Sequence, residues 1–356
     1  ADFIIFKLNN TMRNIYLIIF VFLFLFLSLI QGCYQDNMRI QTIKGGGTID
    51  WASLNQDGSL ITMGSVDSKS GKESIVLYDV TTKQLHTIWE SEQMILNATF
   101  HPLKSNYIAC CDTIKVVLID WKDDKVLFQI PIEDGFIPGM AFSQDGLYLF
   151  IVHSYFSKKI PDGWDEIKNG PYCISEIIKI DVESQTVLEK IILENNIVQG
   201  TDIDTTRNIV GVRYLGGKAE IWDLNHGKCI QSIIHRRGRD CILFVDDNHF
   251  LTDAFPDHPS LRLDNNVIMW NIKDGSRVRG YCPHEMELSG IGIVYNKNNE
   301  RFILSGSKDR RACLWNLDTG KIIWSKRFRD EVRIGVSKDG RRAVLGSFGD
   351  PILIEF

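Results

Sequence analysis

A four-strand pattern that recurs along the chain constrains the fold more than any other feature of this sequence. Its clearest copy is RFILSGSKDRRACLWNLDTGK, residues 301–321, in which two short apolar runs flank a polar turn at 308–311. Apolar runs separated by such a turn predict a β-hairpin. An apolar run at 290–295 and another after residue 321 complete four strands. Because one four-stranded sheet leaves both faces uncovered, the unit is expected to be stable only when it stacks against copies of itself.

The copies share a strand that ends in an acidic or amide residue. These strand ends are Asp79, Asp120, Asp181, Asp223, Asn271 and Asn316, at successive intervals of 41, 61, 42, 48 and 45 residues. A final apolar run at 352–356 completes a seventh unit. A first strand with a polar turn also recurs seven times, from WASLNQDG at 51–58 to IGVSKDG at 334–340. The sequence therefore predicts one all-β domain of seven four-stranded antiparallel units over residues 38–356.

Several of these units resemble the repeats of WD-repeat β-propellers. Trp222-Asp223 is the motif itself, and Trp270-Asn271 and Trp315-Asn316 are near matches. The resemblance covers about residues 38–356 and implies a seven-bladed β-propeller. It assigns structural repeat positions to Trp222, Asp223, Trp270, Asn271, Asp309, Trp315 and Asn316.

The histidine of the family's repeat is the main departure. The Gly-His pair that usually opens each repeat is absent, and only His235 stands where that histidine belongs, nine residues before Phe244. The His-Ser-Asp-Trp hydrogen-bond network of the family is therefore expected to be mostly missing.

The two ends of the repeat region complement each other. The last unit stops after its third strand at Phe356, and Met38–Ile43 is an unmatched strand at the other end. We expect this N-terminal strand to complete the C-terminal blade, because closure removes the open sheet edges that invite aggregation.

The first 33 residues have the pattern of an export signal. Met12 is the expected start, and Arg13 is followed by the apolar run Ile15–Leu27. A charged start, an apolar stretch and a small residue at the cleavage point are typical of a secretory signal. Ile30-Gln31-Gly32-Cys33 resembles the bacterial lipobox, which implies cleavage before Cys33 and lipidation of that cysteine, although Gln31 departs from the usual small residue.

The alternative is that residues 15–30 remain as an uncleaved anchor. Sixteen helical residues reach only about 24 Å, which is short of a bilayer core. Both interpretations place residues 38–356 outside the cytoplasm, behind a short tether at 34–37, as a membrane-anchored protein of a bacterial cell envelope. Tyr34 follows the cysteine, which implies the outer membrane in a Gram-negative host.

Three long excursions, at 67–73, 155–173 and 255–266, lie between predicted second and third strands. In propellers these connections share the top face, and aromatic residues among charges suit a protein interface. The candidate partner-binding residues are Tyr155, Phe156, Lys158, Lys159, Trp164, Asp165, Glu166, Tyr172, Asp257, His258 and Arg262. The alternative is that Trp164 packs back onto its own loop.

Catalytic signals are weak. His258 beside Asp257, and His284 next to Glu285 and close to Glu287, are the only loop histidines near carboxylates. No nucleophile motif or phosphate-binding glycine loop accompanies them, and the cysteines lack zinc-site spacing. We expect both histidines to be surface or structural residues, and we expect neither a cofactor nor a metal.

A net charge of −5 argues against nucleic acid as a partner, since phosphate recognition leaves a basic surface. The favoured hypothesis is a monomeric, membrane-anchored, non-enzymatic scaffold that binds a protein or peptide through its top face. The alternative is an enzyme or small-ligand binder with quinone, sugar or lactone chemistry in the central channel. That alternative requires several carboxylates or histidines facing the channel from different blades.

Overall fold

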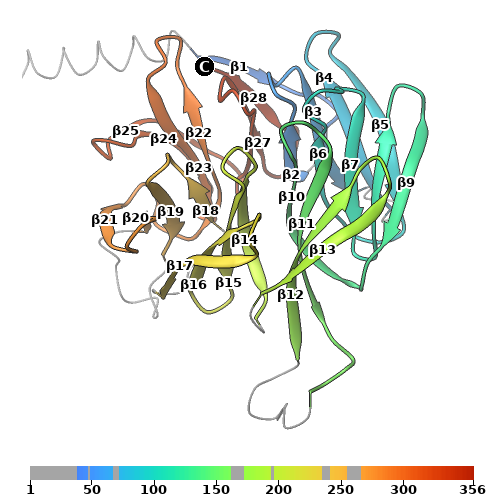
Figure 1. Cartoon of the computed structure of the whole chain (residues 1–356). Coiled ribbons are helices and arrows are strands. Elements are labelled where there is room, and N and C mark those ends of the chain that lie inside the picture. The colour runs from blue at the N-terminus through green and yellow to red at the C-terminus, as the bar shows by residue number, and fades with distance from the viewer. Residues whose placement is uncertain are drawn as a thin grey trace, which may run out of the picture.

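The computed structural model describes residues 38–46, 49–66, 72–161, 172–193, 196–234, 241–254 and 266–356. All regular secondary structure in these residues is β-strand, arranged as seven four-stranded sheets. The sheets stand around a central axis as the blades of a propeller (Figure 1). The predicted all-β, seven-bladed fold is therefore confirmed.

The strands of the first four blades follow the chain in order. Blade 1 consists of β2 (Ile49–Leu54), β3 (Leu60–Val66), β4 (Glu73–Asp79) and β5 (Gln84–Ser91). Blade 2 consists of β6 (Ile95–Phe100), β7 (Tyr107–Asp112), β8 (Lys115–Asp120) and β9 (Lys125–Pro131). Blade 3 consists of β10 (Gly135–Phe142), β11 (Tyr148–Phe156), β12 (Cys173–Asp181) and β13 (Thr186–Ile192). Blade 4 consists of β14 (Val198–Asp204), β15 (Ile209–Tyr214), β16 (Lys218–Asp223) and β17 (Lys228–Ile234).

The last three blades include the one that joins both ends of the chain. Blade 5 consists of β18 (Ile242–Phe244), β19 (His249–Asp253), β20 (Val267–Asn271) and β21 (Arg277–Tyr281). Blade 6 consists of β22 (Leu288–Tyr295), β23 (Arg301–Ser307), β24 (Arg311–Asn316) and β25 (Ile322–Arg327). Blade 7 consists of β26 (Arg333–Val336), β27 (Arg342–Gly346), β28 (Ile352–Glu355) and the N-terminal β1 (Arg39–Thr42).

First strands of neighbouring blades lie against one another around the axis, as β6 does with β2 and β10. They surround the central channel, and the fourth strands form the outer rim. The second-to-third strand connections and the connections between blades share one face, which we call the top face. The other two kinds of turn form the bottom face.

Pairing of β1 with β28 closes the ring, as predicted. Arg39 lies opposite Glu355, and Thr42 lies opposite Ile352. The next residue, Ile43, donates its backbone N–H to the Pro351 carbonyl at 2.8 Å. Blade 7 thus gains its fourth strand from the far end of the chain.

In blades 1 to 6, the acidic or amide residue at the end of the third strand organises the turn that follows. Its Oδ1 accepts backbone N–H groups two or three residues ahead, as Asp79 does from Thr81 at 2.7 Å and Asn316 does from Thr319 at 2.8 Å. The residue four positions after each strand end then takes a positive φ. These residues are Lys83, Asp124, Gln185, Gly227, Gly275 and Gly320. Side chains that bond their own turn are the physical reason for the sequence signal that counted the blades.

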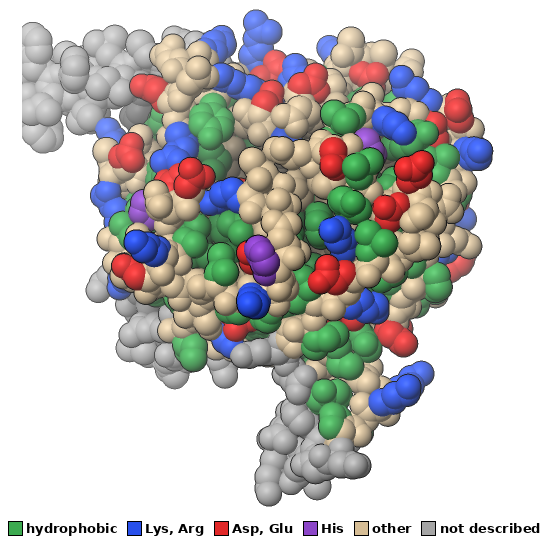
Figure 2. All heavy atoms as spheres, in the orientation of Figure 1, with side chains coloured by type: hydrophobic (Ala, Val, Ile, Leu, Met, Phe, Trp, Pro, Cys, Tyr) green, Lys and Arg blue, Asp and Glu red, His purple; other side chains and the backbone are tan. Residues whose placement is uncertain are grey.

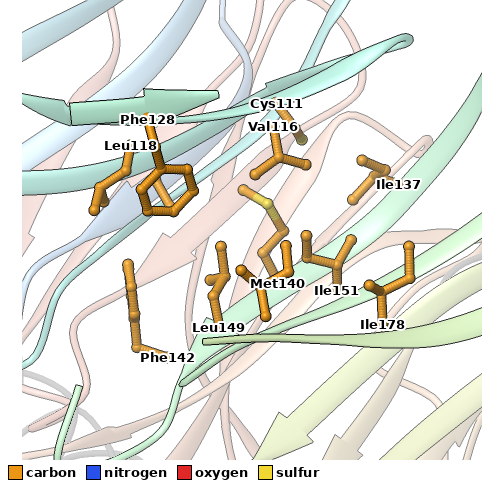
Figure 3. Packing of buried hydrophobic residues seen from close by; sticks show 12 residues of the cluster. Cys111, Val116, Leu118, Phe128, Ile137, Met140, Phe142, Leu149, Ile151 and Ile178 are labelled. Atoms are coloured by element: carbon orange, nitrogen blue, oxygen red, sulfur yellow. The ribbon is translucent and has the colours of Figure 1, made fainter. Parts of the chain in front are cut away.

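The hydrophobic core is divided among the blade boundaries. Each buried cluster of the described residues combines two neighbouring blades. Figure 3 shows the cluster in which Leu118 and Phe128 of blade 2 face Phe142 and Leu149 of blade 3. No blade can therefore bury its apolar faces without its neighbours, as the repeat pattern required.

The N-terminal predictions fall outside the described residues. These are the apolar run at 15–30 and the lipidation site Cys33. Across the parts of residues 38–356 that are described, no helix has the length and apolar character needed to cross a membrane.

Candidate partner-binding face

One hairpin of blade 3 extends beyond the body of the propeller. The strands β11 and β12 each have nine residues, more than any other second or third strand of the described chain. They pair without a break from Tyr148 opposite Asp181 to Phe156 opposite Cys173. The hairpin points downward in Figure 1, away from the blades. We call residues 155–173 the arm.

Tyr155 and Phe156 were expected in a loop, but they are the last two residues of β11. The expected excursion began at Tyr155, so this strand was expected to end with the polar residues His153 and Ser154. Both polar residues are nevertheless fully buried in the sheet, because each finds a hydrogen-bond partner there. The strand therefore continues past them and carries the aromatic pair outward.

The described part of the arm combines exposed apolar and cationic side chains. Phe156 is 58% exposed and Ile160 is 46% exposed, and Lys158 and Lys159 between them are also exposed. Figure 2 shows hydrophobic and cationic side chains on this projection. Backbone bonding holds its first turn, since Ser157 donates its N–H to the Tyr172 carbonyl at 2.9 Å.

A buried ionic cluster stiffens the base of the arm. His153 Nδ1 lies 3.4 Å from Glu176 Oε1, and Lys190 Nζ donates to the same oxygen at 2.9 Å. The His153 ring also stacks on Tyr155 with ring centroids 4.9 Å apart. Burial opposes ionisation of Glu176, but hydrogen bonds from His153 and Lys190 outweigh it and lower the pKa of the carboxyl.

Two serines tie the base of the arm to blade 4. Ser154 Oγ and Ser175 Oγ lie 2.6 Å apart on adjacent strands. Ser175 donates to the Asn196 carbonyl, and Ser154 accepts the N–H of Val198, the first residue of β14, at 3.1 Å. These bonds join the two strands at the base of the arm to each other and to the start of blade 4.

Further apolar side chains are exposed near the top ends of strands in blades 3 and 4. Phe136 is 44% exposed, Ile192 58%, Leu215 51% and Ile234 83%. Asn196 links the two blades there by donating to the Leu215 carbonyl at 2.9 Å. These residues were not predicted from the sequence. A usable signal was the pair Ile233-Ile234, because alternation sends one member of an adjacent apolar pair outward.

Of the predicted site residues, the structure brings Tyr155, Phe156, Lys158, Lys159 and Tyr172 together on the arm. The remaining members lie outside the described residues. They are Trp164, Asp165, Glu166, Asp257, His258 and Arg262, together with the repeat position His235.

Blade 6 contains one complete copy of the network that was expected to be mostly missing. His284 Nδ1 lies 3.0 Å from Asp309 Oδ2, and His284 Nε2 lies 2.8 Å from Ser305 Oγ. Trp315 Nε1 donates to the same Ser305 oxygen at 3.0 Å. The sequence did not reveal this copy, because His284 stands eleven residues before Tyr295, whereas His235 stands nine before Phe244. A register shift between Leu288 and Gly290 accounts for part of that offset.

The network fixes the charge of its histidine. Burial disfavours the charged imidazole, yet the hydrogen bond to Asp309 prevails and raises the pKa of His284 to about 8. The pKa of Asp309 is lowered, because His284 and two backbone N–H groups outweigh its burial. His284 is therefore buried and held by hydrogen bonds on both ring nitrogens.

Blades 4 and 5 also have a tryptophan on the third strand, but its indole N–H donates to a different hydrogen-bond acceptor. Trp270 Nε1 donates to Thr252 Oγ1 at 2.9 Å in blade 5. Trp222 Nε1 donates to Glu220 Oε2 at 2.9 Å in blade 4. Across the described residues, no three His, Cys, Asp or Glu side chains are grouped to hold a metal ion.

These features define the class of protein: a seven-bladed β-propeller in which at least one blade has the WD-repeat hydrogen-bond network. A family model for Eukaryotic translation initiation factor eIF2A matches residues 181–287. F-box/WD repeat-containing protein A of Dictyostelium discoideum is 24% identical over 79% of this chain and 21% of its own length. GID complex subunit 7 of Schizosaccharomyces pombe is 23% identical over 46% of this chain and 31% of its own length.

The chain thus spans about a fifth to a third of these relatives. It is a seven-bladed propeller with WD-repeat relatives, and this supports a protein-interaction scaffold in general.

Proposed function

We propose that this propeller is a non-enzymatic scaffold that binds a protein partner through the arm of blade 3. The observation that carries the proposal is the arm itself, which holds Phe156 and Ile160 in solvent beyond the body of the propeller. Large exposed apolar side chains beside cations are typical of interface anchors. One relative is by its name a subunit of a complex, which agrees with a scaffold role.

The exposed side chains of the arm indicate which kind of partner surface it would bind. Phe156 and Ile160 suit a hydrophobic pocket, and Lys158 and Lys159 between them suit carboxylates at its rim. We therefore propose an acidic partner surface with an apolar centre. The exposed Ile192, Leu215 and Ile234 would extend the contact across blades 3 and 4.

The rigid base of the arm favours binding. Ordering a flexible loop costs free energy that is subtracted from the affinity. Continuous pairing of β11 with β12, and the bonds of Ser154 and Ser175 to blade 4, fix the base before a partner arrives. Little further ordering of the strands is then needed.

We further propose that the N-terminal segment anchors the propeller to a membrane outside the cytoplasm, through lipidated Cys33 or the apolar run before it. Arg39 begins β1 at the bottom face, because a fourth strand runs from bottom to top. Met38 stands five residues after Cys33, and five extended residues span at most about 18 Å. An anchor at Cys33 would hold the bottom face toward the lipid and leave the arm pointing away from it.

The arm is tested by quantitative affinity capture from the source cells, with the full chain as bait. The double variant Phe156→Ser, Ile160→Ser is expected to lose at least tenfold of the partner signal, since both anchors lose their apolar contact. Val126→Ser is the matched control, because Val126 is 51% exposed on β9 of blade 2, outside the arm. Equal capture by the double variant and the wild type would contradict the proposal.

A further inference from the structure

A cavity occupies the bottom mouth of the central channel. Every blade contributes to its wall, through residues at or near the turns between first and second strands. Contribution from all seven blades places the cavity on the ring axis. Its volume is about 890 Å³, within the range of small-molecule sites.

The wall between the turns is mainly apolar. Leu243, Ile291, Ile293, Ile334 and Val336 come from the first strands of blades 5, 6 and 7. All five are partly buried and keep some surface toward solvent. A ligand with an aliphatic segment would cover this surface on binding.

Lys338 brings an unpaired cation to one side of the cavity. It lies in the turn after β26 of blade 7. Among the described residues its ammonium group has no hydrogen-bond or ion-pair partner. Surrounding protein atoms partly desolvate it and lower its pKa, so an anionic group from a ligand would be stabilised there.

Asp202 brings a carboxylate to the other side. It lies on β14 of blade 4, which faces blade 7 across a ring of seven. Its Oδ2 accepts the Phe244 N–H at 2.6 Å, which uses only part of the acceptor capacity of a carboxylate. Neighbouring Asp204 is paired with Arg207 at 2.7 Å. Within the described chain, Asp202 has no ion-pair partner.

We propose that the bottom mouth of the channel is a binding site for a small zwitterion, with its cationic group at Asp202, its anionic group at Lys338 and an aliphatic segment against the wall between them. The two side chains stand on opposite sides and do not pair with each other. A ligand that spans the channel would satisfy both charges at once. The site lies on the face opposite the arm and is independent of partner binding.

The test is isothermal titration calorimetry of the full chain with ω-amino acids of increasing length: 4-aminobutyrate, 6-aminohexanoate and 8-aminooctanoate. The pH is held above the pKa of Asp202, which burial raises to about 6. The best-fitting zwitterion is expected to bind at least tenfold more tightly than the amine or the carboxylic acid of the same length.

Variants separate the two charges. Lys338→Met should lower the affinity for that zwitterion about tenfold, to the level of the amine, and Asp202→Asn should lower it to the level of the acid. Lys297→Met is the matched control, since Lys297 is an exposed lysine in the corresponding turn of blade 6, outside the cavity. It should bind as the wild type does.

Two results would overturn the proposal. One is that no ω-amino acid binds more tightly than its singly charged analogues. The other is wild-type affinity in Lys338→Met, a variant that is expected to fold because residue 338 is exposed. Lys338→Met decides the question even where Asp202→Asn disturbs the hydrogen bond that Asp202 accepts from Phe244.

Discussion

Blades 6 and 3 both bury a histidine beside a carboxylate, but they place the pair differently. In blade 6, His284 comes from the connection before the blade and Asp309 from the turn between β23 and β24, so the pair ties that turn down. In blade 3, His153 lies opposite Glu176 within the paired strands β11 and β12, so this pair does not contact the turn that joins them. The hairpin of blade 6 is therefore short and closed, and that of blade 3 is free to extend as the arm.

The largest expected difference concerns removal of the carboxylate. Asp309→Ala should lower the free energy of unfolding by about 3 kcal/mol, because a buried His284 loses its charged partner. Glu176→Ala should cost about 1 kcal/mol, since His153 keeps its bond to the Glu133 carbonyl and the half-exposed Lys190 returns to water. Urea unfolding of both variants measures the difference. Equal losses would mean that the placement of the pair does not matter.

A smaller effect is expected from pH. The folded-state pKa of His284 is about 8, above its ordinary value of 6.5. Its contribution is therefore fully present below pH 6.5 and is lost as the pH rises through about 8, a change of about 2 kcal/mol. Unfolding free energies measured across this window should fall for the wild type.

The control for that titration is His284→Gln, which cannot titrate. Its unfolding free energy should lack this part of the slope, while all other groups titrate as before. Parallel curves for the two proteins would show that the pair in blade 6 is not charged.

The smallest effect is expected at the outer end of the blade 3 cluster. The Lys190 side chain is 48% exposed, so solvent screens its attraction to Glu176. Lys190→Met should change the free energy of unfolding by about 0.5 kcal/mol or less. Thermal melting of this variant beside the wild type is sufficient. A loss as large as that of Glu176→Ala would make Lys190 a full member of the buried cluster.

Blade count and ring closure could be predicted because they depend on local chemistry. In six blades the third strand ends in a side chain that bonds its own turn, as at Asp79 and Asn316, and these residues recur at similar intervals along the sequence. The unmatched strand Met38–Ile43 could close the ring only by pairing with the incomplete last blade. Such local signals can be recognised in a single sequence.

The features that could not be predicted depend on contacts between residues that are distant in the sequence. His284 was assigned glutamate neighbours from the sequence, whereas its partner Asp309 is 25 residues away. The length of β11 was underestimated because the pairing of Tyr155 with Ile174, and of Phe156 with Cys173, cannot be read from the sequence. Asp202 could not be assigned to the channel, since that requires knowing which positions of β14 face the axis.

The central claim is that the arm serves binding and the blades serve stability. Residues 157–172 can be replaced by Asn-Gly, which favours a two-residue hairpin turn joining Phe156 to Cys173. The decisive measurement is the affinity of this variant for the partner captured by the wild type, with its melting temperature as the check on folding. The account predicts an almost unchanged melting temperature and at least a tenfold loss of affinity. Wild-type affinity in a protein that lacks residues 157–172 would contradict it.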